Sequence, residues 1–365
     1  MNNKKIKVGF IGLNPDSHWA ATAHLPALQS LSEDYEVVGV ANSSLNSAER
    51  TAKALNLKYA FKNYQELVKS PDVDLVVVTV KVPYHYEMVK AALQANKHVF
   101  CEWPLGNGLK EAQELESIAK EKGVVAAIGT QMRYAPEVTY LKELIEKGYV
   151  GKVLSTTLIG TGGNWGDETI NEYYYLFDKG NGATMLTIPV AHTLAGLIEV
   201  LGKVDKISGL MFNNFLTVKV TDTNEIKPKT AEDQIMIQGK LKSGAALSLH
   251  YRGGVSKGVN LLWEINGTEG DIQVVGNSGH GQMAQLSITG AKRNDNNMQP
   301  LIPPAEVYKG WPEFPGARNV GQIYKMIAKD IRSGSRKAPC FADGLELHKL
   351  IENIESSAGD NGRIL

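Results

Sequence analysis

The chain has 365 residues, and its 39 lysines and arginines balance 39 aspartates and glutamates, so its formal charge is zero. Recognition of nucleic acid through a broad surface needs clustered cations, so this balance argues against it, although a local basic patch is not excluded. At about 150 residues per domain, the length predicts two domains. The apolar fraction of 43% is ordinary for a globular protein and does not fit disorder.

Cysteine and histidine usage gives no sign of a metal site. Cys101 and Cys340 are the two cysteines, and neither a CxxC nor an HExxH pattern occurs. The apolar start at 6–13 is broken by glycines and lacks a signal-peptide cleavage site, and the sequence analysis finds no run of about 18 apolar residues. We therefore expect no metal, no membrane span and a cytoplasmic location.

Strand and helix patterns alternate through the first 129 residues. Continuous β-branched runs are typical of strands buried on both faces, and apolar residues at spacings of three and four indicate helices. Such repetition predicts a right-handed, doubly wound parallel sheet, a Rossmann dinucleotide-binding domain over 1–129. The predicted strands are 6–12, 35–41, 59–61, 75–80, 98–102 and 124–129, and the predicted helices are 20–31, 47–55, 64–68, 87–94 and 109–122.

The pattern changes near residue 130 to longer segments that alternate apolar and polar residues. This alternation predicts a large, mainly antiparallel open sheet. Two helices, 320–333 and 345–357, close the chain, so we predict a second, α+β domain over 130–365. The predicted strands of this domain are 154–160, 206–212, 233–241, 245–252, 260–265, 271–275 and 285–289.

The first predicted strand ends in Gly12-Leu13-Asn14, just before a helix. In a dinucleotide fold, such a turn brings backbone N–H groups and a helix N-terminus to the pyrophosphate. A strict G-x-G-x-x-G would need glycines at positions 14 and 17, where the chain has Asn14 and Ser17. Asparagine tolerates left-handed backbone angles, so the turn remains feasible. By itself, the motif is equally compatible with an ordinary strand–turn–helix.

Polar residues without a carboxylate follow the second strand at Asn42-Ser43-Ser44. An NAD enzyme usually places a carboxylate there to hold the ribose hydroxyls. An amide does not repel a 2′-phosphate, and the serines and Arg50 could donate to one. This favours NADP or dual use, with a plain polar turn as the alternative.

Two polar residues mark the end of the fourth strand. Lys81 lies at a strand carboxyl end, where ligands of open α/β sheets bind. His85 opens the next helix. The alternatives are a solvated surface lysine and a structural histidine.

Together with Cys101-Glu102-Trp103-Pro104-Leu105, these residues resemble the Gfo/Idh/MocA family of NAD(P)-dependent sugar and polyol oxidoreductases. The resemblance extends along the chain through an Arg-x-x-Pro at 133–136 and the segments 144–151, 267–271 and 343–345. It implies a Rossmann domain and a C-terminal α/β domain whose open sheet makes a homodimer or homotetramer. It implies that NAD or NADP is held by Gly12, Leu13, Asn14, Trp19, Asn42, Ser43, Ser44, Val80, Val82, His85, Glu102, Trp103, Pro104 and Gln131.

Two positions depart from the pattern of that family. Its usual triplet is Glu-Lys-Pro, whose lysine binds the substrate hydroxyl and helps proton transfer, but Trp103 stands here. An indole N–H donates a hydrogen bond and is no acid or base near neutral pH. Where the family has an Asp four residues before a His, the chain has Ile188 before His192. His192 therefore remains the acid–base candidate, and Lys81 is the candidate replacement for the missing lysine.

Within the family, the chain is most similar to the branch of the fungal galactose-regulon repressors. The shared features include Trp19-Ala20, His85-Tyr86-Glu87, Glu102-Trp103 and His192-Thr193. Those repressors resemble dehydrogenases, bind NAD(P) and act as regulators.

Three hypotheses follow from these features. The first is an NAD(P)-dependent oxidoreductase acting on a sugar or polyol-like small molecule, with Trp165, Tyr174 and His192 lining the substrate site. The second is a catalytically silent NAD(P) sensor that contacts a regulatory protein, motivated by Trp103. The third is an assembly scaffold whose cleft binds nothing. For the aromatic residues, packing under a loop is the plainer interpretation.

Overall fold

The computed structural model describes residues 4–16 and 18–359, and their contacts divide the chain into two compact units. The first unit comprises Met1–Gln131 and Gly310–His348, and the second comprises Met132–Lys309 and Lys349–Leu365. The change of pattern near residue 130 predicts a single second domain over 130–365. Instead, the segment Gly310–His348 returns to the first unit, because its long helix packs on the first helices of the chain.

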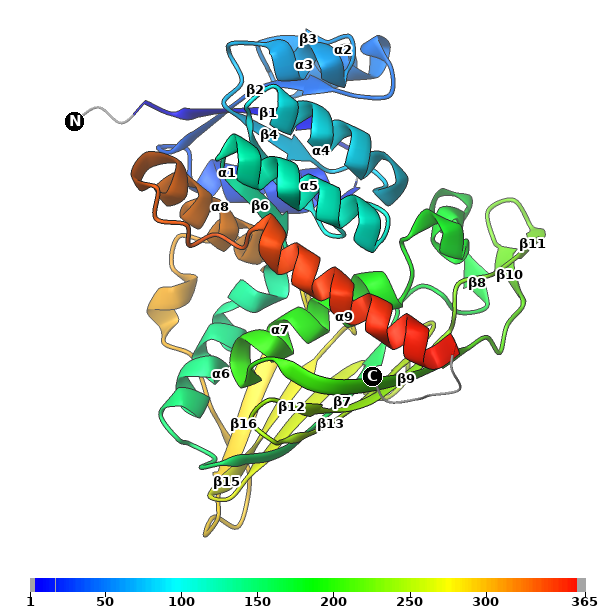
Figure 1. The fold of residues 1–365 in the computed structure, drawn as a ribbon, viewed down its shortest axis with the longest axis vertical. Helices are drawn as coiled ribbons and strands as arrows, with labels where there is room; N and C mark the ends of the chain where they lie inside the picture. Colours follow the sequence, from blue (N-terminus) through cyan, green and yellow to red (C-terminus); the bar gives the residue numbers. More distant parts are fainter. Residues whose placement is uncertain (1–3, 17, 360–365) are drawn as a thin grey trace. The chain divides into compact units, whose positions relative to one another are not determined.

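The first unit is built on a six-stranded parallel sheet in the order β3-β2-β1-β4-β5-β6. This confirms the predicted doubly wound fold (Figure 1). The strand order reverses between β1 and β4, and ligands of such sheets bind beyond the carboxyl ends of the strands at that point. The strands are β1 Ile6–Ile11, β2 Tyr35–Ala41, β3 Tyr59–Phe61, β4 Leu75–Val78, β5 His98–Glu102 and β6 Ala126–Gly129.

Helices cover the parallel sheet, and several begin earlier than predicted. Helix α2 starts at Leu45 because the Ser44 hydroxyl accepts a hydrogen bond from Ser47 N and so caps it. Helix α8 starts at Pro315, which suits the first turn of a helix because proline has no N–H to satisfy. The helical elements are η1 Ala20–His24, α1 Leu25–Ser30, α2 Leu45–Ala54, α3 Tyr64–Lys69, η2 Val82–Tyr84, α4 His85–Gln94, α5 Leu109–Lys122, α8 Pro315–Ser333 and α9 Phe341–Gly359, whose last residues belong to the second unit.

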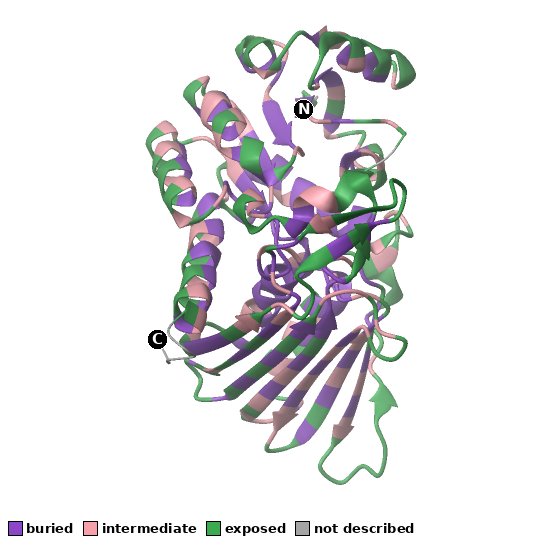
Figure 2. Ribbon diagram, turned by 90° about the vertical axis from the view of Figure 1, so that its right-hand side faces the viewer, coloured by how far each residue is buried: buried purple, intermediate pink, exposed green. Residues whose placement is uncertain are grey.

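The second unit contains an eight-stranded sheet in the order β17-β16-β15-β14-β7-β13-β12-β9. Only β7 and β13 pair in parallel among these strands, which confirms the predicted mainly antiparallel sheet. Burial alternates residue by residue, so one face is packed and the other is open (Figure 2). The strands are β7 Val153–Thr161, β9 Val204–Phe212, β12 Gln234–Leu241, β13 Ala246–Arg252, β14 Leu261–Gly267, β15 Gly270–Gly276, β16 Leu286–Lys292 and β17 Gln299–Pro300.

Several elements of the second unit were not predicted. They are the short helical turn η3 Gln131–Tyr134, α6 Pro136–Glu146, η4 Asn171–Phe177, η5 Lys179–Asn181, η6 Leu186–Val190, α7 Ala191–Leu201, η7 Ala305–Tyr308 and a small sheet of β8 Glu168–Thr169, β10 Thr217–Val220 and β11 Glu225–Pro228.

One stretch of the second unit, Lys179–Leu201, is long and apolar enough to cross a membrane by length and composition. This finding corrects the expectation from the sequence that no run of about 18 apolar residues occurs. Of its most apolar window, 72% is buried inside the structure, as in a core helix of a globular unit.

Candidate functional site

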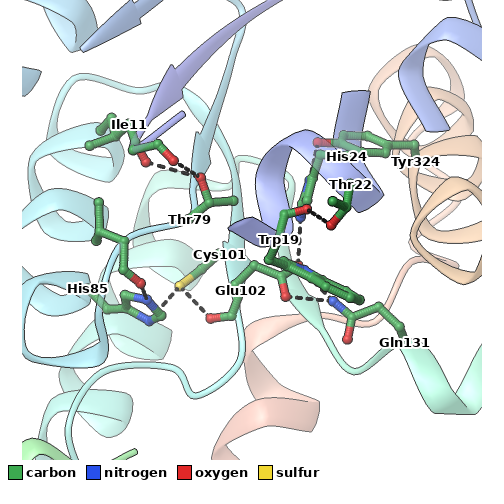
Figure 3. A network of polar contacts seen from close by, with 12 residues as sticks. Ile11, Trp19, Thr22, His24, Thr79, His85, Cys101, Glu102, Gln131 and Tyr324 are labelled. Carbon is green, nitrogen blue, oxygen red and sulfur yellow. Dashed lines mark hydrogen bonds and ion pairs between the residues drawn. The ribbon is translucent and has the colours of Figure 1, made fainter. Parts of the chain in front are cut away.

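The turn after β1 is closed to side chains. Gly12 has φ +93°, and its N–H donates to Ala41 O at 2.9 Å. A Cβ on Gly12 would lie 2.5 Å from Val80 Cγ1. The Thr79 hydroxyl donates to Gly12 O at 2.8 Å, which fixes the turn against the end of β4 (Figure 3). Only glycine fits here, and its backbone is therefore open to close approach by a ligand.

The Asn42 side chain holds this turn from the end of β2. Its Oδ1 accepts from Leu13 N at 3.0 Å, and its Nδ2 donates to Leu13 O at 2.9 Å. Nδ2 also lies 3.2 Å from Thr51 Oγ1. The amide predicted to face the ribose is thus used inside the protein, whereas Ser43 and Ser44 are exposed.

The exits of β4 and β5 are joined by His85, which is buried at the start of α4. Its Nδ1 lies 2.7 Å from Pro104 O and its Nε2 lies 2.8 Å from Val80 O. Lys81 is exposed between Val80 and the buried Val82. The predicted cofactor residues of these two exits therefore form one connected group.

A polar network surrounds Glu102 at the end of β5 (Figure 3). Gln131 Nε2 donates to both Glu102 oxygens at 2.7 Å, and His24 Nε2 lies 3.0 Å from Glu102 Oε1. His24 Nδ1 lies 2.8 Å from Tyr324 OH. Sequence reasoning missed His24 and Tyr324, because no local pattern links residues this far apart in the chain.

Several polar atoms at this edge are buried without a hydrogen-bond partner among the residues that the structure describes. They are Trp19 Nε1, Thr130 Oγ1 and Gln131 Oε1. Buried polar atoms are normally paired, so such orphans mark a place for a polar ligand. Together with the glycine turn, they fit a dinucleotide that lies beyond the carboxyl ends of the strands.

Trp103 directly follows β5, and its side chain is only 4% exposed. Its ring centroid lies 4.6 Å from that of His348, at an interplanar angle of 43°. Burial lowers the pKa of His348 to about 4, so this imidazole is uncharged at neutral pH. The indole of Trp103 is therefore packed against a neutral ring.

His192 lies on α7 in the second unit and is 4% exposed. Its Nδ1 is buried and has no hydrogen-bond partner within the described ranges. Burial, with a smaller contribution from the charge of His280, lowers its pKa to about 3. His192 is therefore neutral near pH 7, and Ile188 supplies no carboxylate one turn earlier.

The two predicted substrate aromatics make different contacts in the second unit. Trp165 is 1% exposed, donates from Nε1 to Leu176 O at 2.8 Å and stacks on His280 with centroids 6.1 Å apart. Tyr174 OH donates to Pro228 O at 2.9 Å, so this ring lies against β11. Trp165 thus packs on His280, whose charge contributes to the lowered pKa of His192.

His280 is a site residue that the sequence analysis did not single out. Its Nε2 lies 2.5 Å from Gly162 O, which places the proton on that nitrogen. A Cβ on either neighbouring glycine would be blocked, at 1.8 Å from Thr161 O for Gly279 and 2.4 Å from Met132 Sδ for Gly281. The glycine–histidine–glycine segment, visible in the sequence, could have indicated a tightly held imidazole.

Comparison with known proteins gives two family matches. Residues 6–130 match the model described as an oxidoreductase family with an NAD-binding Rossmann fold, and residues 136–276 match the C-terminal domain of Gal80p.

Individual relatives fall into two groups. The chain is 32% identical over 307 residues to the galactose/lactose metabolism regulatory protein GAL80 of Kluyveromyces lactis, covering 79% of this chain and 67% of the relative. It is 36% identical over 210 residues to the dehydrogenase aclE of Aspergillus oryzae, covering 55% and 56%. Among solved structures, a super-repressor mutant of Gal80p from Saccharomyces cerevisiae matches with a TM-score of 0.90 at 26% identity, over 99% of this chain and 97% of that one.

Proposed function

Because the chain belongs to the Gfo/Idh/MocA family of oxidoreductases, in the branch that includes the Gal80 regulators, we propose that it is an NAD(P)-dependent oxidoreductase acting on a CH–OH group of a sugar or polyol-like compound. The observation that carries this proposal is His192. The Nδ1 of this buried imidazole lacks a partner among the described residues and can therefore form a hydrogen bond with a ligand hydroxyl.

In this proposal, the first unit binds the dinucleotide at the carboxyl ends of its parallel strands. The Gly12 turn admits the pyrophosphate, and the Asn42 clamp holds that turn in place. The exposed hydroxyls of Ser43 and Ser44 can donate to ribose oxygens or to a 2′-phosphate. When bound, the nicotinamide supplies the hydride chemistry.

The second unit supplies the proton chemistry. His192 is uncharged at neutral pH, so a ring nitrogen can accept a hydrogen bond from the hydroxyl of the alcohol that is oxidised. Trp165 stacks on His280, and the charge of His280 contributes to the lowered pKa of His192. Lys81 remains a candidate for a second proton carrier.

The test is turnover of NAD and NADP, in both redox directions, with a panel of sugars, polyols and keto-sugars. We expect oxidation or reduction of at least one compound by the wild type. His192→Gln should lower kcat by about 100-fold or more. His250→Gln, which changes an exposed histidine on β13, should leave the rate unchanged. An active enzyme that tolerates His192→Gln would refute the assigned role.

A second candidate function is a catalytically silent NAD(P)-binding regulator that contacts a regulatory protein. Trp103 and Ile188 favour it, because they remove the ammonium and the carboxylate of the family pattern from this chain. Its signature would be tight NADH or NADPH binding by calorimetry, with no turnover on the panel. Any reproducible turnover blocked by His192→Gln would exclude a purely regulatory role.

We further propose a homodimer or homotetramer built on the open face of the eight-stranded sheet. That face carries exposed apolar side chains at Ile159, Leu210, Phe212 and Met236. Exposed apolar groups on one sheet face favour association. Light scattering should give a multiple of the chain mass, and Leu210→Glu with Met236→Glu should give a monomer. A monomeric wild type would refute the assembly.

A further inference from the structure

His85 makes two contacts that a neutral imidazole cannot satisfy together. The side chain is buried, with 1% of the residue exposed, and both of its ring nitrogens face backbone carbonyl oxygens. Nδ1 is 2.7 Å from Pro104 O, and Nε2 is 2.8 Å from Val80 O. Figure 3 shows the ring lying at the exits of the neighbouring strands.

The chemistry of the two partners is unambiguous. A carbonyl oxygen only accepts hydrogen bonds, and a neutral imidazole carries a single N–H. If His85 is neutral, one carbonyl faces a nitrogen lone pair at hydrogen-bond distance. If His85 is doubly protonated, both contacts become charge-assisted hydrogen bonds.

The surroundings of the His85 ring affect its pKa in opposite directions. Burial disfavours the charge and lowers the pKa of His85, whereas the two carbonyls and the more distant Glu102 and Glu111 favour it. The thiol of Cys101 lies 3.6 Å from Nδ1 and donates instead to Glu102 O. Burial raises the pKa of that thiol, so it carries no negative charge that would compensate the ring.

We propose that His85 is a positioning residue for the dinucleotide, which in its doubly protonated form ties the exit of β4 to the exit of β5. Loss of one proton releases one of the two carbonyls and loosens this edge of the site. The inference rests on the proposed function, because it assumes that the dinucleotide binds where these two exits lie. NADH should therefore bind more tightly when the ring carries both protons.

Fluorescence titration with NADH tests this, because NADH lacks the 2′-phosphate that titrates in the same range. Since the pKa of His85 lies below its ordinary value near 6.5, we expect affinity to rise about three- to tenfold as the pH falls below that value. His85→Gln, which does not titrate, should lose this dependence. His98→Gln, a control on another histidine of the first unit, should keep it. A wild-type affinity that does not change with pH would overturn the proposal.

Nitrogen NMR of the histidine rings in the ligand-free chain gives a direct second readout. The signal that disappears in His85→Gln should change from one protonated nitrogen to two as the pH falls below about 6.5. A ring that stays neutral throughout the pH range in which the chain is folded would overturn the proposal regardless of NADH binding. A folded wild type that binds no NADH would instead refute the proposed function, and the NMR result would still decide the state of the ring.

Discussion

Replacing Gly12 by alanine tests whether the turn after β1 carries the dinucleotide. Gly12 has φ +93°, where an L-residue costs about 1–2 kcal/mol. The new Cβ would also stand 2.5 Å from Val80 Cγ1, and overpacking of this kind costs about 1–3 kcal/mol. We therefore expect Gly12→Ala to lower the free energy of unfolding by about 2–5 kcal/mol and NADH affinity by more than tenfold.

Gly123→Ala provides a matched control. Gly123 also has a positive φ, +65°, but a Cβ there would meet nothing within 4 Å. It ends α5, away from the residues assigned to the nucleotide. This variant should lose about 1 kcal/mol in urea unfolding and should bind NADH as the wild type does.

Val80→Ala separates the two parts of the effect. Added to Gly12→Ala, it removes the methyl group that the new Cβ would strike, so part of the NADH affinity should return while the backbone strain remains. Val80→Ala alone supplies the reference for the double-mutant cycle. Undiminished NADH binding by folded Gly12→Ala would refute the placement of the dinucleotide at this turn.

Three other predictions concern single side chains. Asn42→Asp should weaken binding of both NADH and NADPH in fluorescence titrations, because the carboxylate loses the donor to the loop backbone; a switch of preference at full affinity would contradict this. Lys229→Met should lower the free energy of unfolding by about 3–5 kcal/mol in urea, because it leaves the buried Asp233 carboxylate without its cation. As a control, Lys142→Met, at a half-exposed lysine, should lower it by less than about 1 kcal/mol. Equal losses in the two variants would refute the reasoning. The free energy of unfolding should fall as the pH drops below about 6.5, because His192 binds its proton near pH 3 when folded but near 6.5 when unfolded. In thermal unfolding, His192→Gln should reduce this loss of stability between pH 6.5 and pH 3. A pH dependence that is the same in His192→Gln as in the wild type would contradict the prediction.

The parallel sheet could be predicted because its signal is local and strong. The run 75–78 is apolar at every position, and the structure buries all four side chains in the centre of the sheet. Alternation over 246–252 likewise predicted a strand with one packed face. The ends of elements were less accurate, because they depend on caps such as Ser44 and on residues such as Pro315 that suit a first turn.

Helix α7 was missed because polar residues are few in it and two of them, His192 and Thr193, are buried. Nearly every side chain from Ala191 to Leu197 is buried, so no amphipathic period is visible. The β10–β11 hairpin was missed because its strands have four residues each and carry exposed charged residues, although Val218 and Val220 are buried in alternation with exposed neighbours. Neither element shows the longer regular pattern of apolar residues on which the predictions were based.

The candidate site was predictable where one chain segment forms it, and not where distant segments meet. The triplet at 102–104 is visible in the sequence, and the turn at Gly12, ambiguous by itself, is supported by the residues that follow the other strands. The clamping role of Asn42 does not, because an amide that faces a ribose and one that holds Leu13 look alike in the sequence.

The return of the chain to the first unit changes how the indole in the triplet should be interpreted. Tyr324 and His348 come from the last part of the chain. Tyr324 is linked to Glu102 through His24, and His348 contacts Trp103 directly. A lysine at position 103 would bring its ammonium against a buried imidazole that resists protonation, whereas the indole packs against that ring at an angle of 43°. The residue at position 103 and the ring at 348 therefore form one unit, and a lysine restored at 103 alone would meet surroundings shaped for an aromatic ring.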